Sequence, residues 1–391
     1  MRRLTLDYLK TESGSGLVLA AAALAAVVVA NSRLGGEYFA LLASPIPLRI
    51  GALSEMLSLA SWVRVFLMPV FFFVLGMELK FEILRGELSN PRRLALPAVA
   101  AIGGLLLPAV IYLALNRDDP SGWAIGCATD GAAALTALTL AGPRLAHSLR
   151  VLLMSVAIVG NLAATLLTAI LDDGTLRDSM LIGAAVVLAL LTLLARWRKA
   201  PFLFYAAGFA LIWGFVLKSG LDTALAGVAC AFTVPIGTRR IGQDSMVRYF
   251  MESLHGYVAF MVRPLFVFTV VGVAYRDLRF ADLGQAAPLG VMLALIVGKP
   301  LGVFTACAAA IGLKLARRPT GAKWIELLGV ALLCGAGGTV SYYVAGMGGE
   351  ASAAVRTAIL IATVASALAG GWILAVAQRG SQRDGGAFDA A

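Results

Sequence analysis

The chain has 391 residues, of which 60% are hydrophobic and only 14% are charged, and its mean hydropathy is +0.87. A water-soluble domain cannot bury so much apolar surface, so the composition excludes an ordinary soluble enzyme or binding module and indicates a membrane protein. The formal net charge of +10 comes mainly from lysine and arginine in short segments between apolar stretches. That pattern is typical of loops that orient membrane helices, and it does not require a nucleic-acid partner.

The apolar stretches recur along the whole chain, and about 20 helical residues are enough to cross a hydrocarbon layer of about 30 Å. They cover residues 16–30, 61–79, 94–115, 122–141, 148–171, 180–195, 202–217, 221–236, 249–273, 287–313, 325–347 and 351–376. We therefore expect an all-α polytopic membrane protein with about twelve transmembrane helices. Its membrane domain spans 13–376, between an N-terminal segment, 1–12, and a tail, 377–391. The loops after the even-numbered spans carry more lysine and arginine, which predicts that both termini are cytoplasmic.

Enzyme chemistry is not expected from this sequence. It has no phosphate-binding glycine loop of the Walker type, no metal-spaced cluster of histidine and cysteine and no nucleophile triad. The four cysteines all fall inside apolar stretches, where a small hydrophobic side chain is the simplest explanation. We expect no cofactor and no redox role.

Two of the apolar stretches contain runs that are poor helix formers. The first reads Gly-Cys-Ala-Thr-Asp-Gly at 126–131, and the second reads Cys-Gly-Ala-Gly-Gly-Thr at 334–339. Each glycine costs up to about 1 kcal/mol relative to alanine inside a helix, so such runs favour an interruption. Interrupted spans at matching places in two halves of a chain indicate a transport site, because unwound backbone within the membrane survives only in a protein interior or a cavity. Small residues also allow close helix packing, which is the alternative.

Three ionisable residues lie well inside the apolar stretches: Asp130, Arg263 and Lys299. A charge at the bilayer centre costs at least about 2.5 kcal/mol, so such residues serve function or pairing. In the functional interpretation, Asp130 attracts or coordinates a cation and the desolvated amine of Lys299 exchanges protons. In the structural interpretation, both neutralise the partial charges at the ends of interrupted helices.

Several motifs point to one known family. They are Phe-Phe-Phe-Val-Leu-Gly-Met-Glu-Leu-Lys at 71–80, Leu-Pro-Ala-Val-Ala-Ala-Ile-Gly-Gly at 96–104, Gly-Trp-Ala-Ile at 122–125, Ala-Thr-Asp at 128–130, Leu-Lys-Ser-Gly at 217–220, Gly-Lys-Pro-Leu-Gly at 298–302 and Leu-Cys-Gly at 333–335. Because these motifs are collinear, the chain from about residue 13 to about residue 376 resembles the NhaA-type sodium/proton antiporters.

This resemblance implies a multi-pass protein of the bacterial inner membrane with inverted repeats at about 94–171 and 287–376. Thr129, Asp130 and Lys299 would lie where two broken helices cross, with Gly335 and Gly337 on the second of them. A hairpin at about 44–54 would join a homodimer. The acidic residues Glu78, Glu82 and Glu252 and the imidazole of His255 would serve the pH response. The resemblance implies Na⁺ or Li⁺ and H⁺ as transported ions, and no other metal.

The fifth span departs from the family pattern. Where the family has two adjacent aspartates that bind the cation and compete for protons, this chain has Gly160 and Asn161. An asparagine offers a neutral carbonyl, whereas hard cations prefer anionic oxygen. Lys299 thereby loses its expected carboxylate partner, and Arg263 adds positive charge. The pair Asp172 and Asp173 belongs to a turn after the span and does not replace the motif.

Three hypotheses follow from this departure. The first is sodium or lithium/proton antiport for pH and sodium homeostasis, with an altered ion site that uses Asp130, Asn161 and Lys299. The second is a transporter with the same fold and another substrate, such as an anion attracted by Lys299 and Arg263. The third is a homologue that does not transport and has a regulatory or structural role.

Overall fold

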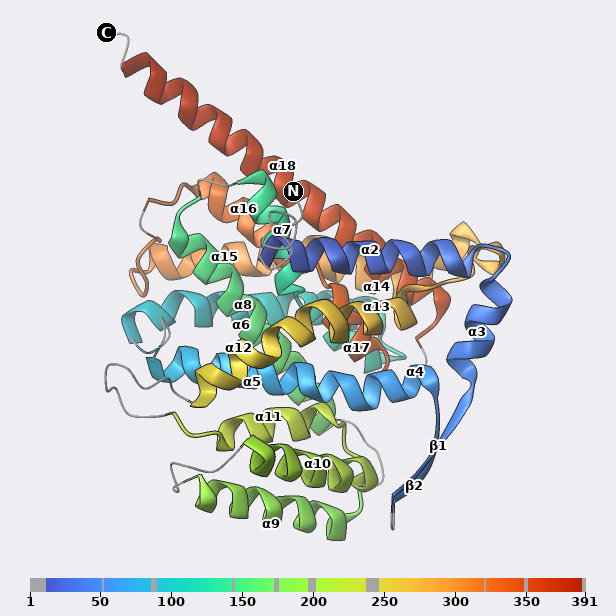
Figure 1. Ribbon diagram of the computed structural model, residues 1–391. Coiled ribbons are helices and arrows are strands. Elements are labelled where there is room, and N and C mark those ends of the chain that lie inside the picture. Colours follow the sequence, from blue (N-terminus) through green and yellow to red (C-terminus); the bar gives the residue numbers. More distant parts are fainter. Residues whose placement is uncertain are drawn as a thin grey trace, which may run out of the picture. The chain divides into compact units, whose positions relative to one another are not determined.

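The computed structural model describes residues 12–50, 53–85, 89, 91–142, 145–171, 176–195, 202–236, 246–319, 321–347 and 351–388. Within these ranges the chain is almost entirely helical, and each of the twelve expected stretches is helical (Figure 1). Eight are long and apolar enough to cross a membrane, and the bent pair α2 and α3 makes a ninth candidate. The other three, α9, α10 and α11, are shorter apolar helices. The expected polytopic helical membrane fold is confirmed.

The chain divides into two compact units. The first takes its described residues from Met1–Ala21, Asn90–Ala164 and Val273–Ala391, and the second from Ala22–Ser89 and Thr165–Gly272. The first contains α6 (Pro91–Leu115), η3 (Pro120–Cys127), α7 (Gly131–Ala141), most of α8 (His147–Leu171), η5 (Tyr275–Asp277), η6 (Phe280–Gly284), α14 (Ala286–Leu293), η7 (Ala294–Gly298), α15 (Lys299–Gly312), α16 (Trp324–Cys334), α17 (Gly338–Ala345) and α18 (Ala353–Phe388). The second contains α3 (Gly35–Ala43), β1 (Pro45–Ile50), β2 (Leu53–Ser58), α4 (Leu59–Trp62), η1 (Val63–Leu67), α5 (Met68–Arg85), α9 (Asp178–Leu194), α10 (Phe202–Ser219), α11 (Ala224–Thr233), α12 (Met246–Tyr257), η4 (Val258–Val262) and α13 (Arg263–Val271). The helix α2 (Glu12–Ala30) contributes to both.

Three spans contain a π-helical turn, and each turn comes directly before a residue–proline pair. The turns are η1, η4 and η7, and the prolines that follow are Pro69, Pro264 and Pro300. Proline has no N–H and its ring collides with the preceding turn, so a wider turn relieves the strain and leaves the helix continuous. The charged residues Arg263 and Lys299 each stand between a π turn and its proline.

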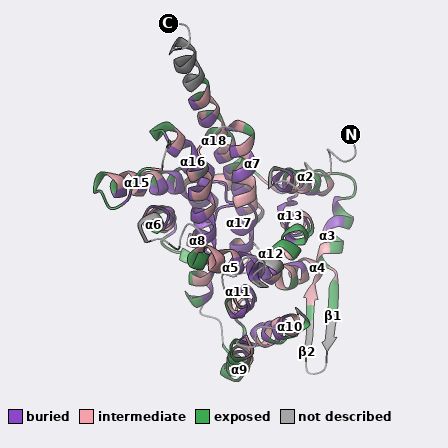
Figure 2. Ribbon diagram, turned by 60° about the vertical axis from the view of Figure 1, so that its left-hand side comes forward, coloured by how far each residue is buried: buried purple, intermediate pink, exposed green. Residues whose placement is uncertain are grey.

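Both expected interruptions are present in the first unit. The first span consists of the 3₁₀ helix η3, an extended segment at residues 128–130 and α7. Asp119, the residue directly before this span, accepts hydrogen bonds from the hydroxyl and N–H of Ser121, which hold the pKa of Asp119 below its usual value. The second span consists of α16, a short break at residues 335–337 and α17. This second span is the most buried of the candidate spans, with 89% of its apolar window inside the protein (Figure 2).

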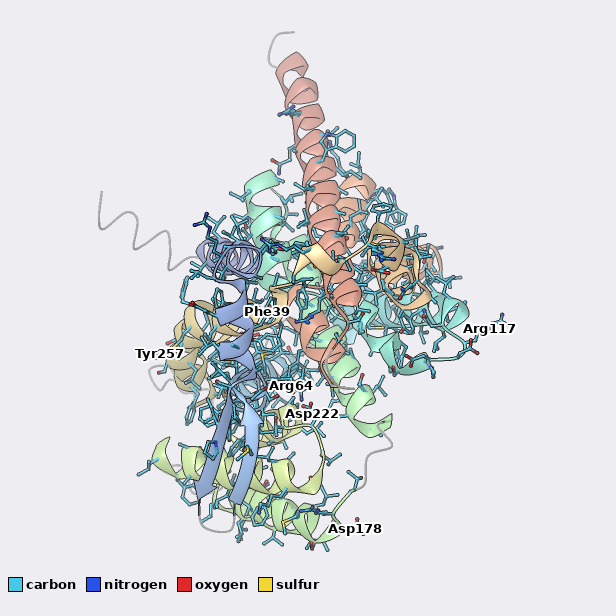
Figure 3. All side chains as sticks on the ribbon, turned by 90° about the vertical axis from the view of Figure 1, so that its right-hand side faces the viewer. Phe39, Arg64, Arg117, Asp178, Asp222 and Tyr257 are labelled. Carbon is cyan, nitrogen blue, oxygen red and sulfur yellow. The ribbon has the colours of Figure 1, made fainter. Side chains whose placement is uncertain are left out.

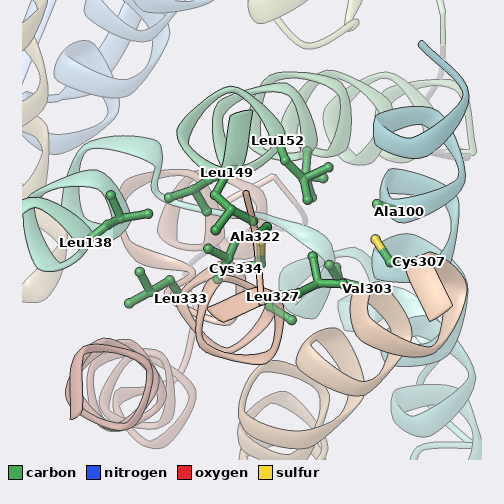
Figure 4. Packing of buried hydrophobic residues seen from close by; sticks show 14 of the residues in the cluster. Ala100, Leu138, Leu149, Leu152, Val303, Cys307, Ala322, Leu327, Leu333 and Cys334 are labelled. Carbon is green, nitrogen blue, oxygen red and sulfur yellow. The ribbon is translucent and has the colours of Figure 1, made fainter. Parts of the chain in front are cut away.

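A leucine- and alanine-rich core holds the first unit together. It gathers buried side chains from α6, α7, α8, α15, α16 and α18, among them Leu138, Leu149, Val303 and Leu327 (Figure 4). The helices α6 and α15 approach closely where Gly103 faces Gly302, since a Cβ on either glycine would collide with the other's carbonyl oxygen. This core fixes the helices that carry the two interrupted spans.

The second unit contains the expected hairpin. Its strands β1 and β2 are antiparallel and pair from Pro45 with Ser58 to Ile50 with Leu53, so the hairpin extends past the predicted limit of residue 54. Asp222, which Figure 3 labels, accepts a hydrogen bond of 2.8 Å from the N–H of Ala224, the first residue of α11. At the other end of the chain, α18 continues to Phe388, well into the predicted tail. The pair Asp172 and Asp173 lies outside the described residues.

Candidate functional site

The two interrupted spans of the first unit are joined directly at their breaks. The N–H of Asp130 donates to Ala336 O at 2.6 Å, and the hydroxyl of Thr129 donates to Cys334 O at 2.9 Å. A third bond of 2.8 Å joins the hydroxyl of Ser341 to Ile125 O. Each break leaves backbone groups without helical partners, and these bonds satisfy them from the other span.

Asp130 caps both helices that start at the crossing. Its Oδ1 accepts from the N–H groups of Ala132 and Ala133 at 3.1 and 3.2 Å, in the first turn of α7. Its Oδ2 accepts from the N–H and the hydroxyl of Thr339 at 2.9 and 2.7 Å, in the first turn of α17. A carboxylate has about four acceptor directions, and these four bonds use them. Asp130 is therefore a shared capping charge that neutralises two helix N-termini.

Gly338 makes this shared cap possible. Its φ of +46° lies in the left-handed region, and a Cβ there would collide with the carboxylate of Asp130. A residue with a side chain would meet both backbone strain and a steric clash at this position. The sequence indicated an interruption in this run, but it did not single out Gly338.

Asn161, on α8, forms hydrogen bonds with the first break through both the oxygen and the NH₂ group of its side-chain amide. Its Oδ1 accepts from the N–H of Thr129 at 2.8 Å, and its Nδ2 donates to Thr129 O at 2.8 Å. The side chain is 3% exposed, and Thr129 is fully buried. This reciprocal pair, which we call the Asn161 clamp, fixes the extended segment against α8.

Lys299, at the start of α15, is buried with its ammonium aimed at the same segment. The Nζ donates to Cys127 O at 2.5 Å. Among the residues whose burial the structure describes, Asp130 and Lys299 are the two buried residues that carry a charge. The site thus combines one fixed carboxylate, one amine and several neutral oxygens.

Gly160, on α8, leaves space for a Cβ beside Cys127 O. A Cβ at position 160 would meet a single neighbouring atom within 4 Å, Cys127 O at 3.6 Å, apart from its own helix backbone. That carbonyl is the same oxygen that accepts from Lys299. A longer side chain at 160 would therefore start beside the amine.

The structure brings together five predicted residues, Thr129, Asp130, Gly160, Asn161 and Lys299, at this crossing. The predicted glycines of the second break lie on the same span. Gly335 faces Leu295 O and the Oγ of Ser366, and Gly337 faces Ser341 and the side chain of Leu295. The roles assigned to these residues in transport stay predictions.

The remaining predicted residues belong to the second unit. The guanidinium of Arg263 lies over the ring of Phe71, 5.6 Å from its centroid. Helices α5 and α12 bring Glu78 and His255 together, with Nδ1 and Oε1 3.8 Å apart. Glu82 lies one turn beyond Glu78 on α5, and Glu252 lies one turn before His255 on α12 and is exposed. Their part in a pH response stays a prediction.

Several groups at the crossing were missed from the sequence. Thr339 gives Asp130 two hydrogen bonds, and its position directly after the glycine run was the available signal. The hydroxyl of Thr363 accepts from the N–H of Gly338 at 3.0 Å. The carbonyls of Cys127 and Cys334 also take part, and a backbone oxygen has no signature in a sequence.

The family model for Na⁺/H⁺ antiporter 1 matches residues 6–374, which include both interrupted spans and every residue of the crossing. The chain belongs to this family. The chain is 41% identical over 381 residues to the Na⁺/H⁺ antiporter NhaA 2 of Pseudomonas syringae pv. syringae, covering 95% of each protein. It is 37% identical over 390 residues to the Na⁺/H⁺ antiporter NhaA 1 of Pseudomonas putida, covering 97% of each. For the NhaA antiporter of Campylobacter concisus, the identity is 39% over 371 residues, with 93% of this chain and 91% of that protein covered. Its membership in this family makes the chain a transporter, and its long apolar helices make it a multi-pass membrane protein.

Proposed function

We propose that this chain is a secondary transporter that exchanges Na⁺ or Li⁺ for H⁺ across the bacterial inner membrane, with an ion site altered at residues 160 and 161. The main observation behind the proposal is the hydrogen bond from the buried amine of Lys299 to Cys127 O. This bond lies next to the break that Asp130 caps. The membership in the antiporter family supports the same ions. A homodimer joined through the hairpin of β1 and β2, and two cytoplasmic termini, are parts of this proposal.

The chemistry at the crossing is a competition for oxygen atoms. The ammonium of Lys299 occupies Cys127 O in the described conformation, so a cation gains that carbonyl only when the amine gives up its proton or moves away. Thr129 and Asn161 add neutral oxygens, which suit a small hard cation but bind it less strongly than a carboxylate does. Asp130 supplies a fixed negative charge that favours a cation nearby.

Reconstitution in liposomes tests the proposal. A sodium or lithium gradient should drive proton movement in the wild type, and Asp130→Asn and Lys299→Ala should lower the rate at least about tenfold, because each removes one of the two buried charges. Matched controls are Asp178→Asn and Lys323→Ala, since both side chains are exposed whereas Asp130 and Lys299 are buried. Absence of any cation response in the wild type, in protein shown to be folded, would exclude the proposal.

A second test restores acidity at the altered position. Position 160 has room for a Cβ, so the side chain of Gly160→Asp would begin beside the oxygen that Lys299 contacts. We expect the KM for Na⁺ to fall severalfold, because an anionic ligand replaces a neutral site. Gly160→Asn fills the same space without the charge and serves as the control. An equal effect from both variants would mean that the carboxylate is not the cause.

The same geometry favours one second candidate, a homologue that does not transport. Asp130, Asn161 and Lys299 all have hydrogen-bond partners within the protein, so the crossing is also a self-satisfied structural contact. In that case the charge-removing variants would lower thermal stability, and neither the wild type nor Gly160→Asp would exchange cations.

A further inference from the structure

A groove lies between α6 and α15, the two helices of the first unit that approach closely at Gly103 and Gly302. Its volume is about 420 Å³. On α6 the lining begins at Gly103 and includes the residues three, four and seven positions later, ending at Val110. On α15 it begins at Gly302, has the same spacing and ends at Ala309. This spacing places each set on one face of its helix, and we call the feature the α6–α15 groove.

The chemistry of the groove suits a hydrocarbon. Among the described residues that line it, Thr305 alone has a polar side chain, and its hydroxyl already donates to Leu301 O at 2.6 Å. The other lining residues are glycine, alanine, leucine and valine. A volume of this size falls within the range of roughly 300–1,000 Å³ that is typical of ligand pockets. An occupant of the groove therefore needs apolar surface and neither charge nor hydrogen-bonding groups.

The groove is continuous with the membrane-facing surface of the protein. Both helices belong to spans that are long and apolar enough to cross a membrane. Leu106 and Val110 form the rim of the groove on α6, and each is 58% exposed. Ile102 and Leu113, further along the same helix, are also exposed. In a multi-pass membrane protein, such an apolar helix face meets lipid hydrocarbon, so the groove opens toward the acyl chains of the bilayer.

A second membrane helix is the alternative occupant, and the packing argues against it. Membrane helices dock where small residues let two backbones approach each other. Here Gly103 and Gly302 already serve the contact of α6 with α15, since a Cβ on either would collide with the carbonyl oxygen of the other. The rim residues Leu106 and Val110 would hold another helix away from the floor. A thin, flexible hydrocarbon chain can enter between such side chains.

We propose that the α6–α15 groove binds one acyl chain of a bilayer phospholipid. Lipid tails are as apolar as leucine, so the preference for the groove comes from the van der Waals contacts that two helices offer and one convex surface does not. The chain would support the crossing from its lipid side. On α6, a Cβ at Gly104 would touch Val303 and the stem of Lys299, so the same crossing positions the buried amine. The proposal concerns lipid binding and does not depend on cation exchange.

Photolabelling locates the bound chain. The protein is reconstituted in vesicles of phosphatidylethanolamine and phosphatidylglycerol that contain a phosphatidylethanolamine with a diazirine in one acyl chain, and labelled peptides are mapped by mass spectrometry. The comparison surface is the exposed apolar face of α18 at Val364, Leu368 and Trp372. We expect the groove lining to be labelled severalfold more than this face. Equal labelling would mean that only exchanging bulk lipid covers the groove, and an unlabelled groove would mean that a protein surface covers it. Either outcome would overturn the proposal.

Filling the groove tests the same site by a second measurement. Thr305→Phe and Ala309→Phe introduce a large side chain at exposed lining positions, and Leu301→Phe is the matched control on α15, exposed but outside the lining. Native mass spectrometry after removal of loosely bound lipid should find one phospholipid retained per chain in the wild type and the control, and a severalfold loss in both filling variants. Thermal unfolding checks that each variant is folded, and Ala309→Leu replaces a variant that is not.

The outcomes also separate this site from the proposed function. Retention of lipid in the filling variants at the wild-type level would overturn the acyl-chain site and leave antiport standing. A wild type that retains the lipid and labels at the groove, but exchanges no cations in the same vesicles, would remove the proposed function and leave this site.

Discussion

At the scale of single residues, Asn161 shows what a neutral side-chain amide contributes at the first break. Its amide both accepts from and donates to Thr129 at 2.8 Å, so the Asn161 clamp depends on having an oxygen and an NH₂ group together. A carboxylate can accept from the N–H of Thr129 but cannot donate to its carbonyl. Residue 161 therefore fixes the backbone of the first break in a way that a carboxylate cannot.

This difference can be measured with Asn161→Asp. The introduced carboxylate would face Thr129 O without a donor between them, and a buried unsatisfied acceptor costs about 1–3 kcal/mol. We expect the Tm of the detergent-solubilised variant to fall by several degrees at neutral pH. Lowering the pH should narrow the difference, because a protonated carboxyl regains a donor. A variant as stable as the wild type at neutral pH would show that the donation to Thr129 O contributes little.

At the scale of elements, one carboxylate organises the start of two helices. The first turns of α7 and α17 both donate to Asp130, and their N-terminal partial charges would otherwise be buried together. The two interpretations of Asp130, structural and functional, therefore describe the same atoms. In the proposed cation exchange, the charge that fixes both broken helices would also attract the transported cation.

The variant Thr339→Val tests this shared cap. Valine keeps the shape of threonine but removes the hydroxyl that donates to Asp130 at 2.7 Å, and hydrogen bonds to charged groups contribute about 1.5–3 kcal/mol. We expect a lower Tm than in the wild type, measured by thermal unfolding in detergent. Thr357→Val is the control, because that hydroxyl bonds only to its own helix. Equal losses in the two variants would contradict a special role for the Thr339 bond.

At the scale of the whole molecule, the distribution of lysine and arginine predicts which loops face the cytoplasm, and the helices agree with the spans on which that prediction rests. The loop before α14 would be periplasmic, and the loop before α16 would be cytoplasmic. Phe280 in the first of these loops is 91% exposed, and Lys323 in the second is also exposed.

Cysteine labelling in intact cells checks this orientation. The four native cysteines are buried, so the wild type should react little with a membrane-impermeant maleimide. Phe280→Cys should be labelled from outside, and Lys323→Cys should be labelled only after the membrane is permeabilised. The reverse pattern would place the termini in the periplasm and contradict the prediction.

Local features of the sequence predicted most of the helices and several residues of the crossing. Hydrophobic stretches located the helices, glycine runs located both interruptions, and the cost of buried charge singled out Asp130 and Lys299. The limits of the hairpin and the end of α18 were less certain, because the ends of elements depend on pairing and packing more than on local composition. Gly338 and Thr339 were missed as partners of Asp130, since their importance comes from a residue about 200 positions earlier in the chain.

The sequence by itself determined the class of the protein and the places where its spans break, because hydropathy and helix propensity are local properties. Only the tertiary structure decided what those residues do for one another. It gave the hydrogen bonds of Asp130 to α7 and α17 and the two-way bond of Asn161 with Thr129. Hydrogen bonds between distant spans, and backbone oxygens above all, depend on how helices cross, and no single stretch of sequence contains that information.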